Sequence, residues 1–197
     1  MEKRQIVAFD FDGTLTTKDT MFEFIRFVKG TWRLWAGIGW CSPVLLAYLL
    51  RLCPNSKAKQ RLFSFFFKDM PYQQFRQLGE DFQARVEELR KAPVVQQLQQ
   101  HLSQGDRVYV ISGSIEEWVR PWCERMGVHR VLATQVEVSE DGCLTGRFSS
   151  PNCFGQEKVN RLLAEEPDRS SYHLTVYGDS RGDRELMALA DEAFMIK

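Results

Sequence analysis

The stretch Ile6-Val7-Ala8-Phe9-Asp10-Phe11-Asp12-Gly13-Thr14 decides the fold of this 197-residue chain. A short apolar run that ends in acidic residues is typical of a central parallel strand, which is buried on both faces. Two similar runs follow, at residues 108–111 before Ser112 and at residues 174–177 before Gly178-Asp179. Helical patterns separate the three runs, so the sequence predicts an α/β fold with a Rossmann-like parallel sheet and right-handed crossovers.

A mostly helical segment is inserted between the first strand and the helix that begins at Pro93. Turn residues divide this segment into four helical pieces. The pieces are residues 20–28, 32–52, 57–68 and 72–91. We therefore expect an α/β core made of residues 1–16 and 92–197, and an α-helical cap at residues 17–91. A hairpin is also predicted around Asp141-Gly142.

The composition is that of an ordinary globular protein, with 44% hydrophobic residues and 26 basic against 26 acidic side chains. A net charge of zero provides no global field for a polyanion, so nucleic acid is not expected as a partner. The five cysteines form no paired spacing, which favours reduced thiols in a cytoplasmic protein. The N-terminus lacks the apolar run of a signal peptide, which favours the same location.

One segment departs from this soluble pattern. Residues 34–50 carry no charge, and Trp32, Trp35 and Trp40 lie near their beginning. A membrane-spanning helix needs about 20 apolar residues, so the segment is at the lower limit of that length. Its internal glycines and Pro43 favour instead a helix buried in a small bundle. A helix that dips into a membrane interface is the intermediate alternative, and it would associate the cap with a membrane.

Reactive side chains follow all three apolar runs, and the carboxyl ends of parallel strands meet at one edge of a sheet. Asp10 and Asp12 lie two residues apart and project to the same side of a continuing strand. Crowded carboxylates repel one another, and a hard divalent cation relieves this repulsion. Asp179, at another strand end, adds an oxygen ligand of the kind that Mg2+ prefers. The sequence therefore predicts a Mg2+ site beside Asp10.

The two acids of the first motif suit phosphoryl transfer. Asp10 is ionised at neutral pH, so it needs no base to act as a nucleophile towards phosphorus. Asp12 is placed to donate a proton to the leaving group and later to take one from water. The charge on the transferring oxygens requires positive and hydrogen-bonding partners, for which Lys158 and the Thr14 hydroxyl are candidates.

Two serines follow the second strand. Ser114 has the spacing of a helix capping box with Glu117, so we expect it to close the next helix. This leaves Ser112 free to hold phosphate, with Gly113 permitting a close approach of the backbone. Asp183 has the spacing of the acid in a similar capping box, and both a capping and a functional role are open for it.

Together these motifs resemble those of the haloacid dehalogenase-like phosphatases. The matching segments are residues 10–16, 110–114, 155–158 and 178–183, in the same order and over essentially the whole chain. The resemblance implies that Asp10 is the nucleophile and Asp12 the general acid and base. It also implies that Ser112 and Lys158 bind the phosphoryl group of the substrate.

The same resemblance implies Mg2+ held by Asp10, the Asp12 carbonyl and Asp179, with Asp183 in support. The enzyme expected from it is a Mg2+-dependent phosphomonoester hydrolase that forms an aspartyl phosphate. Its expected partner is a phosphorylated small molecule whose identity the sequence does not assign.

The helical insertion looks like the cap of the phosphoserine-phosphatase-like subclass, but it departs from that cap at substrate-binding positions. Asp19 stands where the subclass has a substrate-binding glutamate. The subclass also has an arginine that binds the substrate carboxylate. In this chain the corresponding position falls near Phe63, and Arg61 lies two residues away from it. Asp19 and Arg61 are therefore the candidate specificity residues, and phosphoserine is only a remote alternative substrate.

The long apolar second piece of the cap and residues 153–159 look more like the phosphatidylglycerophosphatase C-like branch. Lys57, Lys59 and Arg61, beside a run of phenylalanines, suit anionic lipid headgroups. An amphipathic helix with a solvated basic face explains them equally well. Phosphatidylglycerophosphate is thus the alternative substrate, with a phospholipid headgroup as the alternative partner.

Two classes without turnover are disfavoured. A phospho-receiver carries a phosphorylatable aspartate on a parallel sheet but has no cap, and Asp12 would shorten the life of its phosphoaspartate. A non-catalytic binder is not expected to keep acids at every motif. Other phosphate-binding classes lack support because no GxxxxGK[ST] or GxGxxG motif follows a strand.

Overall fold

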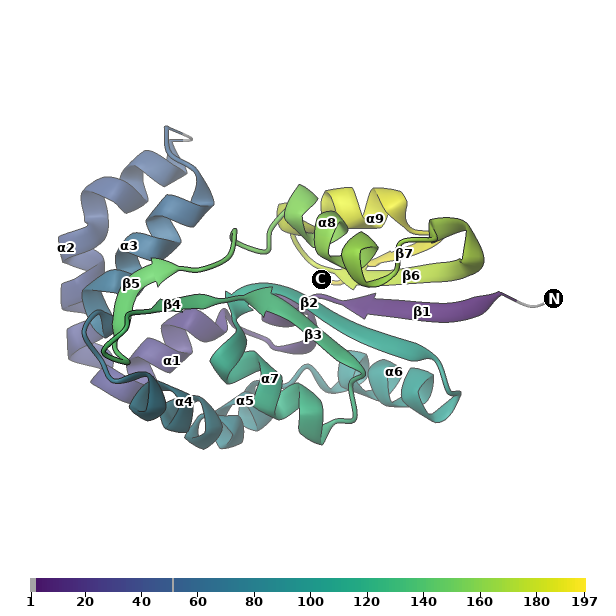
Figure 1. Cartoon of the computed structure of the whole chain (residues 1–197), viewed down its shortest axis with the longest axis horizontal. Helices are drawn as coiled ribbons and strands as arrows, with labels where there is room; N and C mark the ends of the chain where they lie inside the picture. The colour runs from purple at the N-terminus through teal and green to yellow at the C-terminus, as the bar shows by residue number, and fades with distance from the viewer. Residues whose placement is uncertain (1–2, 51) are drawn as a thin grey trace.

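A five-stranded sheet lies at the centre of the molecule, in the computed structural model that describes residues 3–50 and 52–197 (Figure 1). Its order is β3-β2-β1-β6-β7, and every neighbouring pair is parallel. The strands are β1 (Arg4–Phe9), β2 (Arg107–Ile115), β3 (Arg130–Thr134), β6 (Tyr172–Gly178) and β7 (Glu192–Met195). The predicted α/β fold with a parallel sheet is confirmed.

The first apolar run forms the central strand β1 because both of its faces are covered. Val7 and Phe9 belong to one hydrophobic cluster, and Ile6 and Ala8 belong to the cluster on the opposite face. Phe9 pairs in register with Val110 of β2 and Tyr177 of β6. The residues that follow these three positions therefore emerge together at one edge of the sheet.

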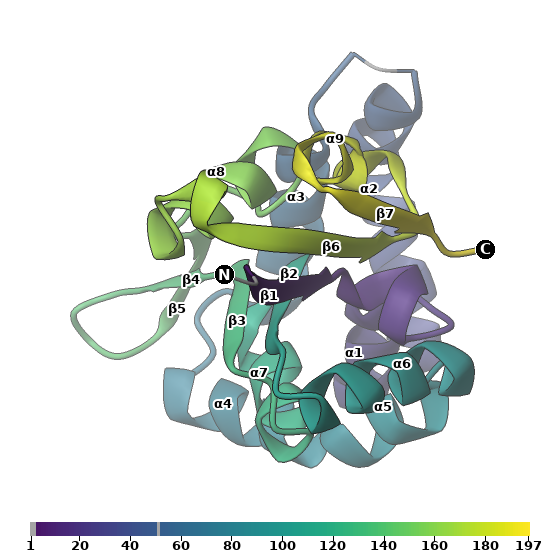
Figure 2. The same cartoon turned by 90° about the vertical axis from the view of Figure 1, so that its right-hand side faces the viewer.

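Helices cover both faces of the sheet, as Figure 2 shows. The helices α6 (Ala92–Ser103) and α7 (Glu116–Arg125) pack in the cluster that contains Val7 and Phe9. The helices α8 (Gln156–Glu165) and α9 (Arg184–Leu189) pack on the other face, where Val159, Leu162 and Leu186 are buried. This layering is typical of a doubly wound parallel sheet.

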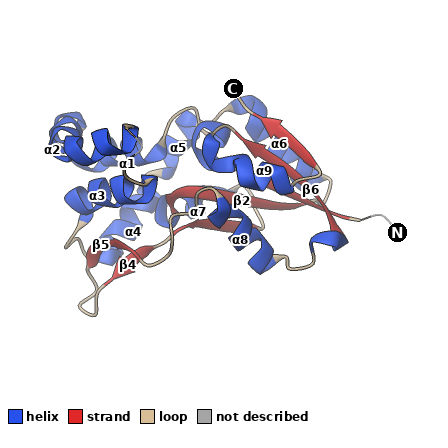
Figure 3. Ribbon diagram, turned by 90° about the horizontal axis from the view of Figure 1, so that it is seen from above, coloured by secondary structure: helices blue, strands red, loops and turns tan. Residues whose placement is uncertain are grey.

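The insertion gathers at one end of the strands, as seen from above in Figure 3. Its helices are α1 (Thr20–Lys29), α2 (Thr31–Leu49), α3 (Asn55–Phe67), α4 (Tyr72–Asp81) and α5 (Gln83–Leu89). The single helix predicted at 72–91 is wrong, because the chain breaks at Phe82, whose fully buried ring packs edge-on against Phe24. Within residues 3–50 and 52–197, no helix combines the length and apolarity needed to cross a membrane.

The predicted hairpin forms and packs against the insertion. It consists of β4 (Val136–Val138) and β5 (Leu144–Phe148). Leu144 accepts a backbone hydrogen bond from Asp69 at 2.8 Å and donates one to Met70 at 2.9 Å. The link between α3 and α4 is therefore joined to the hairpin by backbone hydrogen bonds, which fixes α3 relative to the end of the sheet.

Candidate active site

A cavity of about 300 Å3, here called the inner cavity, lies where the ends of β1, β2 and β6 meet the insertion. Residues of both the sheet edge and the insertion line it. They are Asp10, Asp12, Gly13, Thr17, Lys18, Asp19, Asn55, Lys59, Ser112, Gly113, Ser114, Asn152, Phe154, Lys158, Asp179, Ser180 and Gly182. The structure thus brings most of the predicted site residues together in one place.

A buried ion-pair cluster forms the floor of this cavity. Lys158, in the first turn of α8, donates to Asp10 Oδ1 and to Asp183 Oδ1, both at 2.6 Å. Burial raises the pKa of Asp10 to about 7; the Lys158 charge opposes this shift and the Asp183 charge adds to it. The lysine therefore holds the Asp10 carboxylate in a fixed position and favours its ionised form.

Three neighbouring carboxylates, two of which line the inner cavity, suit a divalent cation. Oxygens of Asp10, Asp179 and Asp183 all lie within 4.8 Å of one another. Burial raises the pKa of Asp179, and the Asp183 charge adds to the shift. Asp179 Oδ1 is buried and has no hydrogen-bond partner among the described residues. Hard oxygen donors that lack a partner are what Mg2+ requires, so the residues present fit this ion.

Asp183 also stabilises the structure in two ways, by its bond to Lys158 and by a helix capping box. Its second oxygen accepts from the backbone and hydroxyl of Ser180, both at 3.0 Å, which closes a capping box. The capping role considered for Asp183 is therefore confirmed. Because Lys158 and Ser180 engage both Asp183 oxygens, Asp10 and Asp179 are the better placed metal ligands. A side chain at Gly13 would collide with the Asp179 carboxylate, which explains the glycine there.

Asp12 is held by the junction of sheet and insertion. Its Oδ1 accepts from the Thr20 backbone at 2.9 Å and the Thr20 hydroxyl at 2.6 Å. Its Oδ2 accepts from the Ser114 hydroxyl. The indole of Trp118 in turn donates to the Thr20 hydroxyl at 3.1 Å. Both oxygens of the proposed general acid are thus oriented by buried donors.

The expectation that Ser114 caps α7 is wrong. The residue before that helix is Ile115, which provides no side-chain cap. Ser114 is fully buried, and its hydroxyl instead donates to Asp12. Ser112 lines the inner cavity, as predicted, but its hydroxyl accepts a hydrogen bond from the Ser114 backbone at 3.0 Å. Ser112 therefore keeps its hydroxyl proton free for another acceptor.

Two other predicted residues lie away from the cavity surface. Thr14 is fully buried and does not line the inner cavity, and its hydroxyl has no hydrogen-bond partner among the described residues. Arg61 is exposed on α3 and does not line the inner cavity either. Asp19 does line the inner cavity, while its carboxylate caps α1 through the backbones of Met21 and Phe22.

Sequence reasoning missed the roles of Thr20, Lys59 and Asn152 in this site. From the sequence, Thr20 is only the first residue of a predicted helical piece, and Lys59 is assigned either to anionic lipid headgroups or to a solvated basic face. Asn55 and Lys59 lie four residues apart, which places them on one face of α3. This spacing is the sequence signal that the two residues could act together. No local pattern, however, shows that their face of α3 is turned towards the sheet edge.

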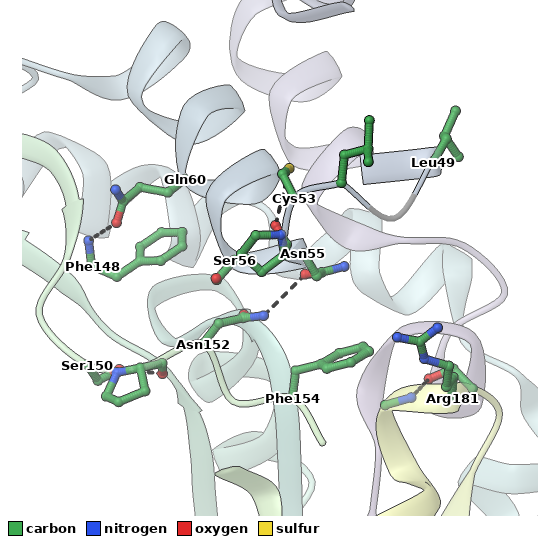
Figure 4. A pocket seen from close by; sticks show the side chains of 15 residues that line it. Leu49, Cys53, Asn55, Ser56, Gln60, Phe148, Ser150, Asn152, Phe154 and Arg181 are labelled. Atoms are coloured by element: carbon green, nitrogen blue, oxygen red, sulfur yellow. Dashed lines mark hydrogen bonds between the residues drawn. The ribbon is translucent and has the colours of Figure 1, made fainter. Parts of the chain in front are cut away.

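A second cavity, here called the outer cavity, continues from the inner one and measures about 900 Å3. The two cavities share Asn55, Asn152, Phe154, Ser180 and Gly182. Figure 4 shows Asn55 and Asn152 facing each other across the outer cavity, joined by a hydrogen bond of 3.2 Å. Its other walls are mainly apolar, formed by Leu49, Leu52, Cys53, Pro54, Phe148 and Pro151, with Arg181 and the polar Ser56, Gln60 and Ser150.

The chain belongs to the haloacid dehalogenase-like hydrolase family, whose model matches residues 7–188. It is 31% identical to Protein CicA of Caulobacter vibrioides, over 95% of this chain and 83% of that protein. A solved protein of unknown function from Bordetella pertussis Tohama I superposes with a TM-score of 0.83 at 18% identity, over 98% of this chain and 90% of that one.

A substrate-bound phosphoserine phosphatase complex superposes with a TM-score of 0.68 at 17% identity, over 98% of this chain and 86% of that one. At such low identities the two solved structures show the shared fold. The predicted enzyme of the haloacid dehalogenase-like family is confirmed. The narrower resemblance to the phosphatidylglycerophosphatase C-like branch is not confirmed and stays a prediction.

Replacing Lys158 with methionine should lower the free energy of unfolding by about 3–5 kcal/mol at pH 8, because two buried carboxylates lose their shared partner. Without the lysine, the folded-state pKa of Asp10, which burial already raises, rises further above its unfolded value. The folded variant then binds this proton more tightly than the unfolded chain does, so the deficit should be smaller at pH 5 and grow as the pH rises.

Urea unfolding of the metal-free variant and wild type at both pH values measures this difference. Lys18→Met is the matched control, since the Lys18 side chain is 54% exposed and should change stability little. A deficit for Lys158→Met that is equal at pH 5 and pH 8 would contradict the assignment of a charged buried cluster.

Proposed function

We propose that the protein is a Mg2+-dependent phosphomonoesterase that works through an aspartyl phosphate on Asp10. The observation that carries this proposal is the convergence of Asp10, Asp12, Ser112 and Lys158 on one small cavity. The haloacid dehalogenase-like family and the fold shared with a phosphoserine phosphatase support the same reaction class. We also infer that the insertion, residues 17–91, acts as a cap that closes this cavity.

In the first step a carboxylate oxygen of Asp10 attacks phosphorus and the bond to the ester oxygen breaks. Lys158 holds the attacking carboxylate in place, and Ser112 with the Gly113 backbone binds the phosphoryl oxygens. Asp12 gives its proton to the departing oxygen. A Mg2+ ion bound by Asp10 and Asp179 would supply positive charge to the phosphoryl group.

In the second step a water molecule attacks the aspartyl phosphate, Asp12 takes up its proton, and phosphate and free Asp10 are released. The donors from Thr20 and Ser114 keep Asp12 on the side of the insertion, where the leaving group departs. This second step argues against a long-lived phospho-receiver, because an oriented base shortens the life of the phosphoaspartate.

Asp10→Asn should abolish Mg2+-dependent phosphate release from p-nitrophenyl phosphate, since the amide is not a nucleophile. Asp106→Asn is a matched control, because Asp106 pairs with His101 outside both cavities and should retain activity. Both proteins should unfold cooperatively in urea. Turnover by Asp10→Asn at more than about one hundredth of the wild-type rate would overturn the proposed mechanism.

A second candidate, hydrolysis of a lipid phosphate at a membrane surface, is favoured by the solvent face of α2. Trp32, Trp35 and Trp40 on this helix are 83%, 60% and 69% exposed. Leu46 and Leu49 continue the exposed apolar surface towards the outer cavity, which Leu49 also lines. Large exposed apolar patches mark interaction surfaces, and tryptophans favour the membrane interface. An amphiphilic substrate would reach the cavity directly from such a surface.

Vesicle sedimentation tests this second candidate. The protein should sediment with phosphatidylglycerol-containing vesicles more than with pure phosphatidylcholine, because basic residues such as Arg33 flank the apolar face. Replacing Trp32, Trp35 and Trp40 together with glutamine should abolish sedimentation, whereas Met195→Gln, at an exposed site on β7, should not. Absence of wild-type binding to both vesicle types would exclude the membrane-surface candidate.

A further inference from the structure

Lys59 is a cation of the insertion that reaches the end of the sheet. Its ammonium donates to the Gly113 carbonyl oxygen at 2.6 Å, across the boundary between α3 and β2. In the part of the chain that the structure describes, Lys59 forms no ion pair within 4.0 Å. An ammonium carries three donors, and the Gly113 bond uses one of them. Burial raises the pKa of Asp19 and the Lys59 charge opposes this rise, so the two side chains interact although they form no ion pair within 4.0 Å. Lys59 therefore retains two N–H donors that no described carboxylate accepts at ion-pair distance.

The other lysines of the inner cavity are engaged. Lys158 is buried between Asp10 and Asp183, and Lys18 points its mostly exposed side chain towards Glu23 at 3.6 Å. Lys158 therefore neutralises carboxylates at the floor of the cavity, and Lys18 pairs with a carboxylate of α1. Among the lysines that line this cavity in the described part of the chain, Lys59 is thus the one that forms no ion pair within 4.0 Å.

Lys59 lies where it can contact the leaving group of a bound phosphoester. Displacement at phosphorus is in line, so the leaving group points away from Asp10 and towards the insertion. Lys59 lies on the same face of α3 as Asn55, which lines both cavities. The ammonium is thus placed beside the passage through which the leaving group extends into the outer cavity.

We propose that Lys59 binds an anionic group on the leaving group, a carboxylate or a phosphodiester, and so selects substrates that carry a second negative charge. This inference rests on the proposed phosphomonoesterase function and adds a specificity residue to it. A charged pair of this kind contributes to the binding of the whole substrate, and an uncharged leaving group cannot form it. The outer cavity gives such a leaving group room to be large.

The test compares esters that share a glycerol frame. Glycerol 3-phosphate has an uncharged leaving group, 3-phosphoglycerate adds a carboxylate, and phosphatidylglycerol phosphate in detergent adds a phosphodiester. Wild type should favour one of the two anionic esters over glycerol 3-phosphate by about 10-fold or more in kcat/KM, as expected for a hydrogen bond between charged groups. The preferred ester distinguishes a small acid from a lipid headgroup as the source of the charge.

Lys59→Met should raise KM for the preferred anionic ester by about 10- to 100-fold and leave kcat/KM for glycerol 3-phosphate within about 2-fold. Lys59→Arg should restore most of the preference, because it keeps the charge. Lys57→Met is the matched control, since Lys57 is exposed on the same helix and lines neither cavity.

An equal loss on all three esters in Lys59→Met would overturn the inference, because Lys59 would then bind the phosphoryl group or fasten the insertion to Gly113. Equal use of the three esters by wild type would also overturn it, while leaving the proposed hydrolysis intact. Failure of wild type to hydrolyse any of these esters or p-nitrophenyl phosphate would instead contradict the proposed function itself.

Discussion

The burial of one lysine between two aspartates is the constraint on which the site depends. Lys158 bonds Asp10 and Asp183 at 2.6 Å each, and all three side chains are almost completely shielded from water. Such a cluster tolerates little movement, because any lost contact leaves a buried charge without a partner. It joins the end of β1 to α8 and to the turn after β6. The proposed nucleophile, Asp10, is therefore positioned before any substrate enters.

Residues near the sheet edge could be predicted from the sequence because the rule for parallel strands is local. An apolar run followed by acids fixes both the strand and the side chains at its end, which is why Asp10, Ser112 and Asp179 converge as expected. Ser114 was misinterpreted because a capping-box spacing is also local, while its actual partner, Asp12, is distant in sequence. A local pattern cannot show that the Ser114 hydroxyl bonds a residue distant in sequence instead of capping the next helix.

The insertion was harder to predict for a related reason. Its helices were predicted from periodicity, but the direction in which each helix turns depends on packing against the sheet and the hairpin. Arg61 was chosen from its position in a motif and lies on the exposed side of α3, whereas Lys59 faces the inner cavity. The insertion thus contributes Thr20 to orient Asp12, and Lys59, which reaches the Gly113 carbonyl, for the proposed contact with the leaving group. We thus assign the reaction to the residues at the sheet edge and the choice of substrate to the residues of the insertion.

Acid quenching during turnover, followed by peptide mass mapping, determines which residue carries the phosphoryl group. We expect one phosphoryl group covalently attached to Asp10, present only when substrate and Mg2+ are both supplied. The phosphorylated peptide should disappear as the substrate is exhausted, because water completes the second step. A phosphoryl group on any other residue, or full turnover with no phosphorylated peptide at any quench time, would contradict the role proposed for Asp10.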